Sequence, residues 1–207
     1  MKLNKVEKIK WIIFVILLIL FIALVLLIKT NKTLTIDSIT YTFISKNIIS
    51  KTLTPIVNFI TNLGGVIYFI IISVGALILV KNRKISLAIS LNIALGALLN
   101  KVVKHLIQRE RPTEEIRLIE ESGFSFPSGH SAVSMIFYGF MIYLVNKYIK
   151  NKYLKLFFTI LLSALIILIG LSRVYLGVHY ITDVLGGFLI GVMFLIVYIS
   201  AYQKLTK

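Results

Sequence analysis

The sequence contains no cysteine, so disulfide bonds and thiolate metal sites are excluded, and cysteine usage gives no indication of the redox compartment. It also contains no internal repeat, no low-complexity segment and no stretch with the composition of an interdomain linker. Acidic residues are scarce, with 8 Asp and Glu against 23 Lys and Arg, and five glutamates lie in the single segment 108–126. These absences predict a single domain over residues 1–207.

Apolar residues dominate the chain, which excludes an ordinary soluble domain. They make up 58% of the 207 residues, and the mean hydropathy is +0.94. The net charge of +15 would suit nucleic-acid binding, but the basic residues lie in short clusters between apolar runs, as membrane-flanking charges do. The composition therefore predicts a membrane protein with no nucleic-acid partner.

Six apolar segments predict an all-α, polytopic protein with six transmembrane helices. A helix rises about 1.5 Å per residue, so roughly 20 apolar residues cross the hydrocarbon core of a bilayer. No small-residue cleavage site follows the first segment, which favours a membrane anchor over a signal peptide. Residues 36–51 have apolar side chains at near-helical spacing, which predicts an interfacial helix or, as an alternative, a structureless loop. The six segments are 11–28, 56–80, 85–107, one that starts within 123–131 and continues to 145, 156–171 and 181–202.

The basic residues indicate the orientation of these helices. If the N-terminus is cytoplasmic, 13 of the 23 Lys and Arg lie on the cytoplasmic side with Glu7 as the one acidic residue beside them. The other side then has 10 basic and seven acidic residues, and the positive-inside rule favours this arrangement. Both termini are then cytoplasmic, and the segments before His130 and His179 share the extracytoplasmic face of the cell membrane.

Residues 123–131, Gly-Phe-Ser-Phe-Pro-Ser-Gly-His-Ser, carry the signals of a turn and a helix start. Pro127 suits the first turn of a helix, which places Ser128, Gly129 and His130 near the N-terminus of that helix. Free backbone N–H groups and the helix dipole attract anions there, and a glycine lets a ligand approach closely. This segment alone predicts a phosphate site or, equally, a plain loop-to-helix junction with a capping serine.

Further charged residues fall at the same predicted face. Lys104 and Arg111 are seven residues apart, so on a helix they would project from nearly one face and could hold one polyanion. His179 and Asp183 are four apart, so at a helix start the carboxylate could accept from one ring nitrogen and leave the other as a free nucleophile. Arg173 adds a third cation. Each has an ordinary alternative in snorkelling or local ion pairing, but chance rarely assembles the whole set at the outer ends of four helices.

These residues form a three-part pattern that resembles the type 2 phosphatidic acid phosphatase superfamily, which includes bacterial lipid phosphatases and the vanadium haloperoxidases. The family carries Lys, six residues and Arg-Pro; then Pro-Ser-Gly-His; then Ser-Arg, five residues, His, three residues and Asp. The pattern is present without a departure, and the six-span membrane subtype covers nearly all the rest of the chain. Its residues are Lys104, Arg111 and Pro112; Pro127, Ser128, Gly129 and His130; Ser172, Arg173, His179 and Asp183.

The resemblance implies a role for each part of the pattern. His179 would be the nucleophile, oriented by Asp183, and His130 would be the acid that protonates the leaving oxygen. No metal and no other cofactor are implied. The residues that would hold the phosphoryl oxygens are Lys104, Arg111, Ser128, Gly129 and Arg173.

The predicted function is that of a membrane lipid phosphatase. It would hydrolyse a phosphomonoester or pyrophosphate head group through a phosphohistidine, with the lipid tail between helices, because phosphoryl transfer needs charge neutralisation and in-line attack. Undecaprenyl pyrophosphate is the first choice, since the carrier pyrophosphate is released on the extracytoplasmic side; phosphatidylglycerophosphate and phosphatidic acid are alternatives. Two other classes stay open: a haloperoxidase that holds vanadate in this pocket, disfavoured by the six spans, and a non-catalytic scaffold or transporter, disfavoured by the complete motif.

Overall fold

The computed structural model describes residues 5–31 and 34–206, and the regular secondary structure in these residues is all helical. This confirms the predicted all-α fold class. Helix formation follows the long apolar runs, the basic clusters lie mostly at the helix ends beside the connections, and the glutamate-rich segment joins α5 to α6. The helices are α1 (Lys5–Thr30), α2 (Thr35–Asn47), α3 (Leu53–Asn62), α4 (Val66–Leu79), α5 (Arg83–Ile107), the short 3-10 helix η1 (Glu114–Ile116), α6 (Gly129–Tyr148), α7 (Lys152–Tyr175) and α8 (Ile181–Leu205).

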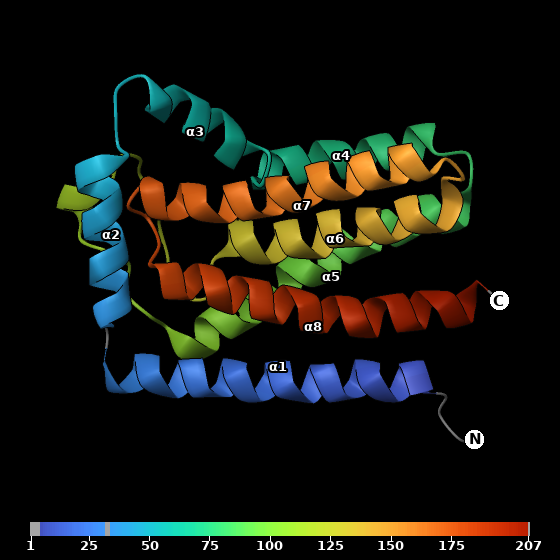
Figure 1. Cartoon of the computed structure of the whole chain (residues 1–207), viewed down its shortest axis with the longest axis horizontal. Helices are drawn as coiled ribbons and strands as arrows, with labels where there is room; N and C mark the ends of the chain where they lie inside the picture. Colours follow the sequence, from blue (N-terminus) through green and yellow to red (C-terminus); the bar gives the residue numbers. More distant parts are fainter. Residues whose placement is uncertain (1–4, 32–33, 207) are drawn as a thin grey trace.

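Helix α6 lies at the centre of the bundle, where it packs against α5, α7 and α8 (Figure 1). Helix α1 packs on α8 from the outside, while α3 contacts α7 and α4 contacts α5. Helix α2 crosses one end of the bundle instead of running along it, and it contacts α7 and α8 (Figure 1). Because α6 begins with the Gly-His sequence of the second motif, its central position puts that motif among the helices that carry the other two.

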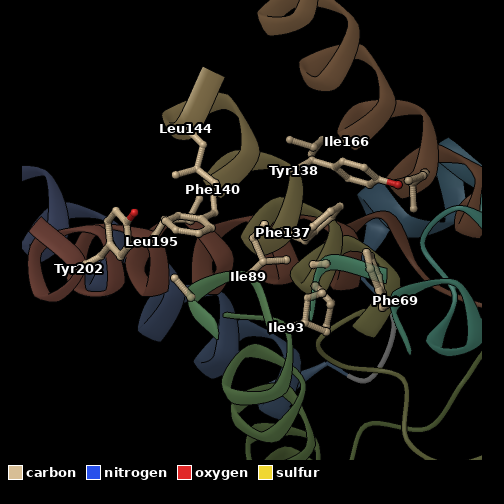
Figure 2. Close-up of a cluster of buried hydrophobic side chains, with 14 residues drawn as sticks. Phe69, Ile89, Ile93, Phe137, Tyr138, Phe140, Leu144, Ile166, Leu195 and Tyr202 are labelled. Carbon is tan, nitrogen blue, oxygen red and sulfur yellow. The ribbon is translucent and has the colours of Figure 1, made fainter. Parts of the chain in front are cut away.

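The main hydrophobic core surrounds α6. Figure 2 shows Phe137, Tyr138 and Phe140 of this helix among apolar side chains from α4, α5, α7 and α8. Phe69 of α4 lies edge-on to Phe137 with 5.5 Å between ring centroids, and Tyr202 of α8 lies edge-on to Phe140 at 5.4 Å. Such pairs add about 0.5–1.5 kcal/mol to the free energy of burial. The aromatic core therefore fixes α6 along its length, while the N-terminal end of the helix supplies polar groups to the site.

Four helices, α1, α5, α7 and α8, are long and apolar enough to cross a membrane, and α3 with α4 forms a fifth candidate that is bent by 45°. The prediction of six spans is therefore not confirmed within the described residues. The expected span 56–80 is broken at Gly64 and Gly65, where a Cβ atom on Gly64 would lie 2.8 Å from the Ser134 hydroxyl of α6. Helix α6 itself has buried serines, such as Ser131 and Ser134, and so has the polarity of an interior helix rather than of a lipid-facing one.

Residues 36–51 contain helix α2, so the alternative of a structureless loop is wrong for most of this segment. Ile36, Ile39 and Phe43 are exposed on the helix, as an interfacial helix requires. Asp37 on the same helix is only 1% exposed and faces the bundle. The location of α2 at a membrane surface stays a prediction, but its anchoring by a buried charge is a property of the fold.

The polar segments of the chain separate to the two ends of the bundle (Figure 1). The start of α1, the end of α8, the α4–α5 connection and the α6–α7 connection lie at one end, and α2 with the segment that joins α5 to α6 lies at the other. Lys2 and Lys207, which the orientation prediction counts as cytoplasmic, lie outside the described residues. The helices thus bring the three motifs to one end of the bundle, and the assignment of that end to the extracytoplasmic side stays a prediction.

Candidate active site

Ser128 provides the N-cap of α6. Its Oγ accepts hydrogen bonds from the Ser131 backbone N–H at 3.4 Å and from the Ser131 hydroxyl at 3.0 Å, and the Ser128 N–H donates to the Asp183 carbonyl oxygen at 3.0 Å. Helix α6 begins at Gly129, so Pro127 lies before the cap and its predicted place in the first helical turn is wrong. Ser128 is fully buried, whereas Gly129 and His130 line the cavity described below.

His179 and Asp183 lie at the start of α8, in contact with each other. The Asp183 Oδ2 atom is 3.3 Å from His179 Nδ1, and the Arg111 Nη1 atom is 3.1 Å from His179 Nε2. Since a guanidinium can only donate, Nε2 is the acceptor and Nδ1 carries the proton toward the carboxylate. Burial, followed by the positive charge of Arg111, lowers the pKa of His179 well below its ordinary value. A neutral ring with an unprotonated Nε2 is the form that a nucleophile requires, and in this structure the Nε2 lone pair accepts the hydrogen bond from Arg111.

Lys104 and Arg111 converge on the site, but they do not project from one helix. Helix α5 ends before Gln108, which has a φ of 54°, so Arg111 lies in the following loop. The interpretation of the seven-residue spacing as one helical face is therefore wrong, because Pro112 disfavours helical backbone at the residue before it. The loop returns Arg111 to the site, where its Nη1 donates to the Val178 carbonyl oxygen at 2.8 Å. Lys104 Nζ donates to a carbonyl oxygen of the same loop at 2.5 Å.

Arg173 is buried beneath a carboxylate that the sequence analysis did not single out. Its Nη2 atom forms an ion pair with Glu121 Oε2, and its Nη1 donates to the Thr61 hydroxyl at 2.9 Å. Its Nε has no hydrogen-bond partner in the described residues. Glu121 also lies 3.7 Å from Arg111 Nη2 and lines the cavity, whereas Arg173 is not part of that lining. Glu121 therefore holds the place at which an incoming anion would meet both guanidinium groups.

Arg109 and Asp37 were also missed by the sequence analysis. Arg109 Nη1 donates to Asp183 Oδ1 at 2.6 Å, and its Nη2 donates to Asp37 Oδ2 at 2.7 Å. Both residues are almost fully buried, at 5% and 1% exposed. In the sequence, Asp37 and Arg109 are single charges outside the fixed positions of the three motifs, and their partners lie more than 70 residues away along the chain. Only the fold identifies them as neighbours of the site.

A cavity of about 500 Å³ joins the polar groups to the apolar faces of α4 and α5. Its polar end contains both histidines, and its apolar part follows the two helices along the bundle. Among the described residues, no three His, Asp or Glu side chains lie together as ligands for a metal ion. The polar lining consists mainly of Lys104, Arg111, Glu121, Gly129, His130 and His179, and the apolar lining of Val66, Phe69, Ile70, Val74, Ile93, Ala94, Ala97 and Val133.

These features define a helical membrane protein with a cationic, histidine-containing site at one end of its bundle. Residues 85–207 match the family model described as the PAP2 superfamily, and this range includes all three motifs. Because the match covers more than half of the chain, the protein belongs to the PAP2 superfamily, as the motifs predicted.

Curated relatives and solved structures agree with this assignment. Phosphatidylglycerophosphatase B of Bacillus subtilis (strain 168) is 45% identical over 98 residues, which cover 46% of this chain and 47% of that relative, or about half of its length. Undecaprenyl-diphosphatase of Sulfolobus acidocaldarius is 27% identical over 163 residues, 75% of each chain. The crystal structure of a transmembrane PAP2 type phosphatidylglycerolphosphate phosphatase from Bacillus subtilis has a TM-score of 0.79 at 33% identity, covering 92% of this chain and 96% of that one. Aquifex aeolicus LpxE, with a TM-score of 0.66 at 22% identity over 82% of this chain and 98% of that one, supports the fold alone.

Proposed function

We propose that this protein is an integral membrane phosphatase that hydrolyses the phosphomonoester or pyrophosphate head group of a lipid. The observation that carries the proposal is the His179 ring, held by Asp183 on one side and turned toward the cationic end of a largely apolar cavity. A nucleophile beside several cations suits phosphoryl transfer, because that reaction is catalysed mainly by positioning and by neutralisation of the phosphoryl oxygens. Membership of the PAP2 superfamily supports the same reaction class.

The charge on the phosphoryl group would be neutralised by Lys104, Arg111 and Arg173, assisted by Ser128 and Gly129. The first two side chains reach the cavity directly, and Arg173 becomes available when Glu121 moves aside. Gly129 lies at the N-terminus of α6, where backbone N–H groups and the helix dipole favour an anion. No metal ion is part of this proposal, since the basic side chains supply the charge.

The reaction would proceed in two steps. Nε2 of His179 attacks phosphorus, the bond to the leaving oxygen breaks, and His130 donates a proton to that oxygen. His130 then takes a proton from water as the water attacks the phosphohistidine, which releases inorganic phosphate and regenerates the free ring. The presence of His130 and His179 in the lining of the same cavity supports this division of roles.

The lipid tail would lie in the apolar part of the cavity. Val66, Ile70 and Val74 of α4 line the cavity and are exposed, which supports a cavity that opens sideways between α4 and α5. A sideways opening lets an acyl or prenyl chain stay in the bilayer while its head group reaches the cations. We place the site on the extracytoplasmic face, on the basis of the distribution of basic residues.

Two substrates are equally supported within this chemistry. Undecaprenyl pyrophosphate agrees with an extracytoplasmic site and with the name of the Sulfolobus relative. Phosphatidylglycerophosphate agrees with the names of the two Bacillus subtilis proteins, one of which is 45% identical over the aligned part.

The test is phosphate release by the purified protein from both lipids and from phosphatidic acid, with and without excess chelator. We expect release from at least one lipid at a rate that the chelator leaves unchanged, and none from a His179→Ala variant. Activity that the chelator abolishes and magnesium restores would contradict the mechanism. A protein without phosphatase activity that oxidises halide with added vanadate and peroxide is a haloperoxidase, and one without either activity is a scaffold or transporter.

A further inference from the structure

Asp183 has several partners besides His179, and one of them is Arg109. Its Oδ2 atom faces His179 and accepts from the Ser125 hydroxyl, while its Oδ1 atom accepts from Arg109 Nη1 at 2.6 Å. The two oxygens are thus committed to opposite sides, and Asp183 is fully buried. Rotation of the carboxylate out of its present plane would break the Arg109 contact, so this contact fixes the plane of the carboxylate relative to the histidine.

Arg109 is itself held by helix α2. Its second nitrogen donates to Asp37 Oδ2 at 2.7 Å, and the Asp37 carboxylate also accepts from the Thr182 N–H at 3.1 Å and the Thr182 hydroxyl at 2.8 Å. The Tyr180 ring covers the guanidinium, with 4.1 Å between Cζ and the ring centroid. One planar guanidinium therefore spans two buried carboxylates that come from α2 and α8.

The charge balance of this cluster gives Asp37 a role of its own. Without Asp37, the full positive charge of Arg109 would act on Asp183 and weaken its attraction for the His179 ring. With Asp37 present, the charge of Arg109 is neutralised on the side away from Asp183. The main effect of Arg109 is then to orient the Asp183 carboxylate. Asp37 lies outside residues 85–207, the range that matches the family model, so the family assignment gives it no role.

We propose that Arg109, held by Asp37 of α2, is a positioning residue that fixes the Asp183 carboxylate and through it the orientation of the His179 nucleophile. This inference rests on the proposed phosphohistidine mechanism. It makes α2 part of the catalytic apparatus instead of a peripheral anchor.

Two variants test the inference. Asp37→Asn keeps the shape of the side chain and removes its charge, and Arg109→Lys keeps the charge but replaces the planar fork with a single ammonium that cannot span both carboxylates. Either change alters the orientation of Asp183. We expect kcat for phosphate release to fall about 10- to 100-fold with KM within about twofold, because a small misplacement of a reacting group costs rate on this scale.

Inhibition by two anions separates positioning from structural damage. Orthovanadate mimics the transition state and bonds to the nucleophilic nitrogen, whereas inorganic phosphate is held by the cations alone. In both variants the inhibition constant for vanadate should rise about 10-fold or more, in parallel with the loss of rate, while that for phosphate should stay within about twofold. Unchanged kcat and vanadate inhibition, or an equal weakening of vanadate and phosphate, would overturn the inference.

Tyr41→Phe is the matched control. Tyr41 also lies on α2, and its hydroxyl ties the helix to the Ile116 carbonyl oxygen at 3.0 Å without reaching Asp183. This variant should keep wild-type kcat and vanadate inhibition; a loss as large as that of Asp37→Asn would mean that any loosening of α2 has this effect, and would refute positioning. A wild-type protein that releases no phosphate would instead refute the proposed function, so the two failures are distinguishable.

Discussion

Substitution of Glu121 should tighten the binding of a phosphate anion, whereas most substitutions in a binding site weaken ligand binding. Its carboxylate pairs with Arg173 and lies 3.7 Å from Arg111, so a phosphoryl group must displace it to reach both guanidinium groups. A hydrogen bond to a charged group is worth about 1.5–3 kcal/mol when it is well buried. The Glu121 side chain is 30% exposed, so solvent screening reduces this to about 1.4 kcal/mol, or roughly tenfold in an equilibrium constant. Glu121→Gln removes the competing charge and should therefore tighten anion binding about tenfold.

The assay is competitive inhibition of the wild-type and Glu121→Gln proteins by inorganic phosphate, with KM for a lipid phosphate measured in parallel. Both constants should fall by a similar factor in the variant, because the same internal anion opposes both ligands. Glu120→Gln is the matched control, since Glu120 is exposed on the same loop and is not part of the cavity lining. Weaker phosphate binding by Glu121→Gln would show that Glu121 organises Arg173 for substrate instead of competing with it, and the reasoning would then be wrong.

Two further predictions concern topology and the roles of the histidines. Because the chain has no cysteine, single cysteines at Lys84 and Glu115 are clean probes, and an impermeant thiol reagent should label the Glu115 position and spare Lys84; labelling at Lys84 alone would invert the orientation. His130→Ala should slow hydrolysis of an alkyl phosphate about 10²- to 10⁴-fold more than that of p-nitrophenyl phosphate, whose phenolate leaves without an acid. His179→Ala should abolish both reactions and the acid-labile phosphoryl label, so equal losses in the two variants with label retained in His179→Ala would exclude these roles.

Local periodicity was enough to predict most of the helices, but it did not predict where an apolar segment breaks into two helices. The apolar runs at α1, α5, α7 and α8 are long, and their helices form as expected. The segment 56–80 contains a comparable number of apolar residues, but Gly64 and Gly65 allow a break that brings the chain close to α6. A glycine pair in an apolar run is compatible with a straight packed helix or with a bend, and the choice depends on a neighbour that the sequence does not identify.

Sequence spacing also predicted only some of the contacts in the candidate site. The four-residue spacing of His179 and Asp183 predicts a contact, because His179 lies just before α8 and Asp183 lies in its first turn. The spacing of Lys104 and Arg111 does not, because the helix ends between them and the loop determines where Arg111 lies. Asp37 could not be found in this way, since it is 146 positions from Asp183 and its single charge on an amphipathic helix has no periodic partner.

The charge balance of the proposed site does not depend on the buried pair Asp37 and Arg109. The charges of Asp37 and Arg109 neutralise each other. Together the two residues orient Asp183 without adding net charge to the site. The remaining cations, Lys104, Arg111 and Arg173, exceed the charge of Asp183 by two once Glu121 is displaced, and two is the charge of a phosphomonoester dianion. The motif residues alone give this same balance. What they do not give is the direction of the Asp183 carboxylate, and that direction depends on a guanidinium and a helix that no motif contains.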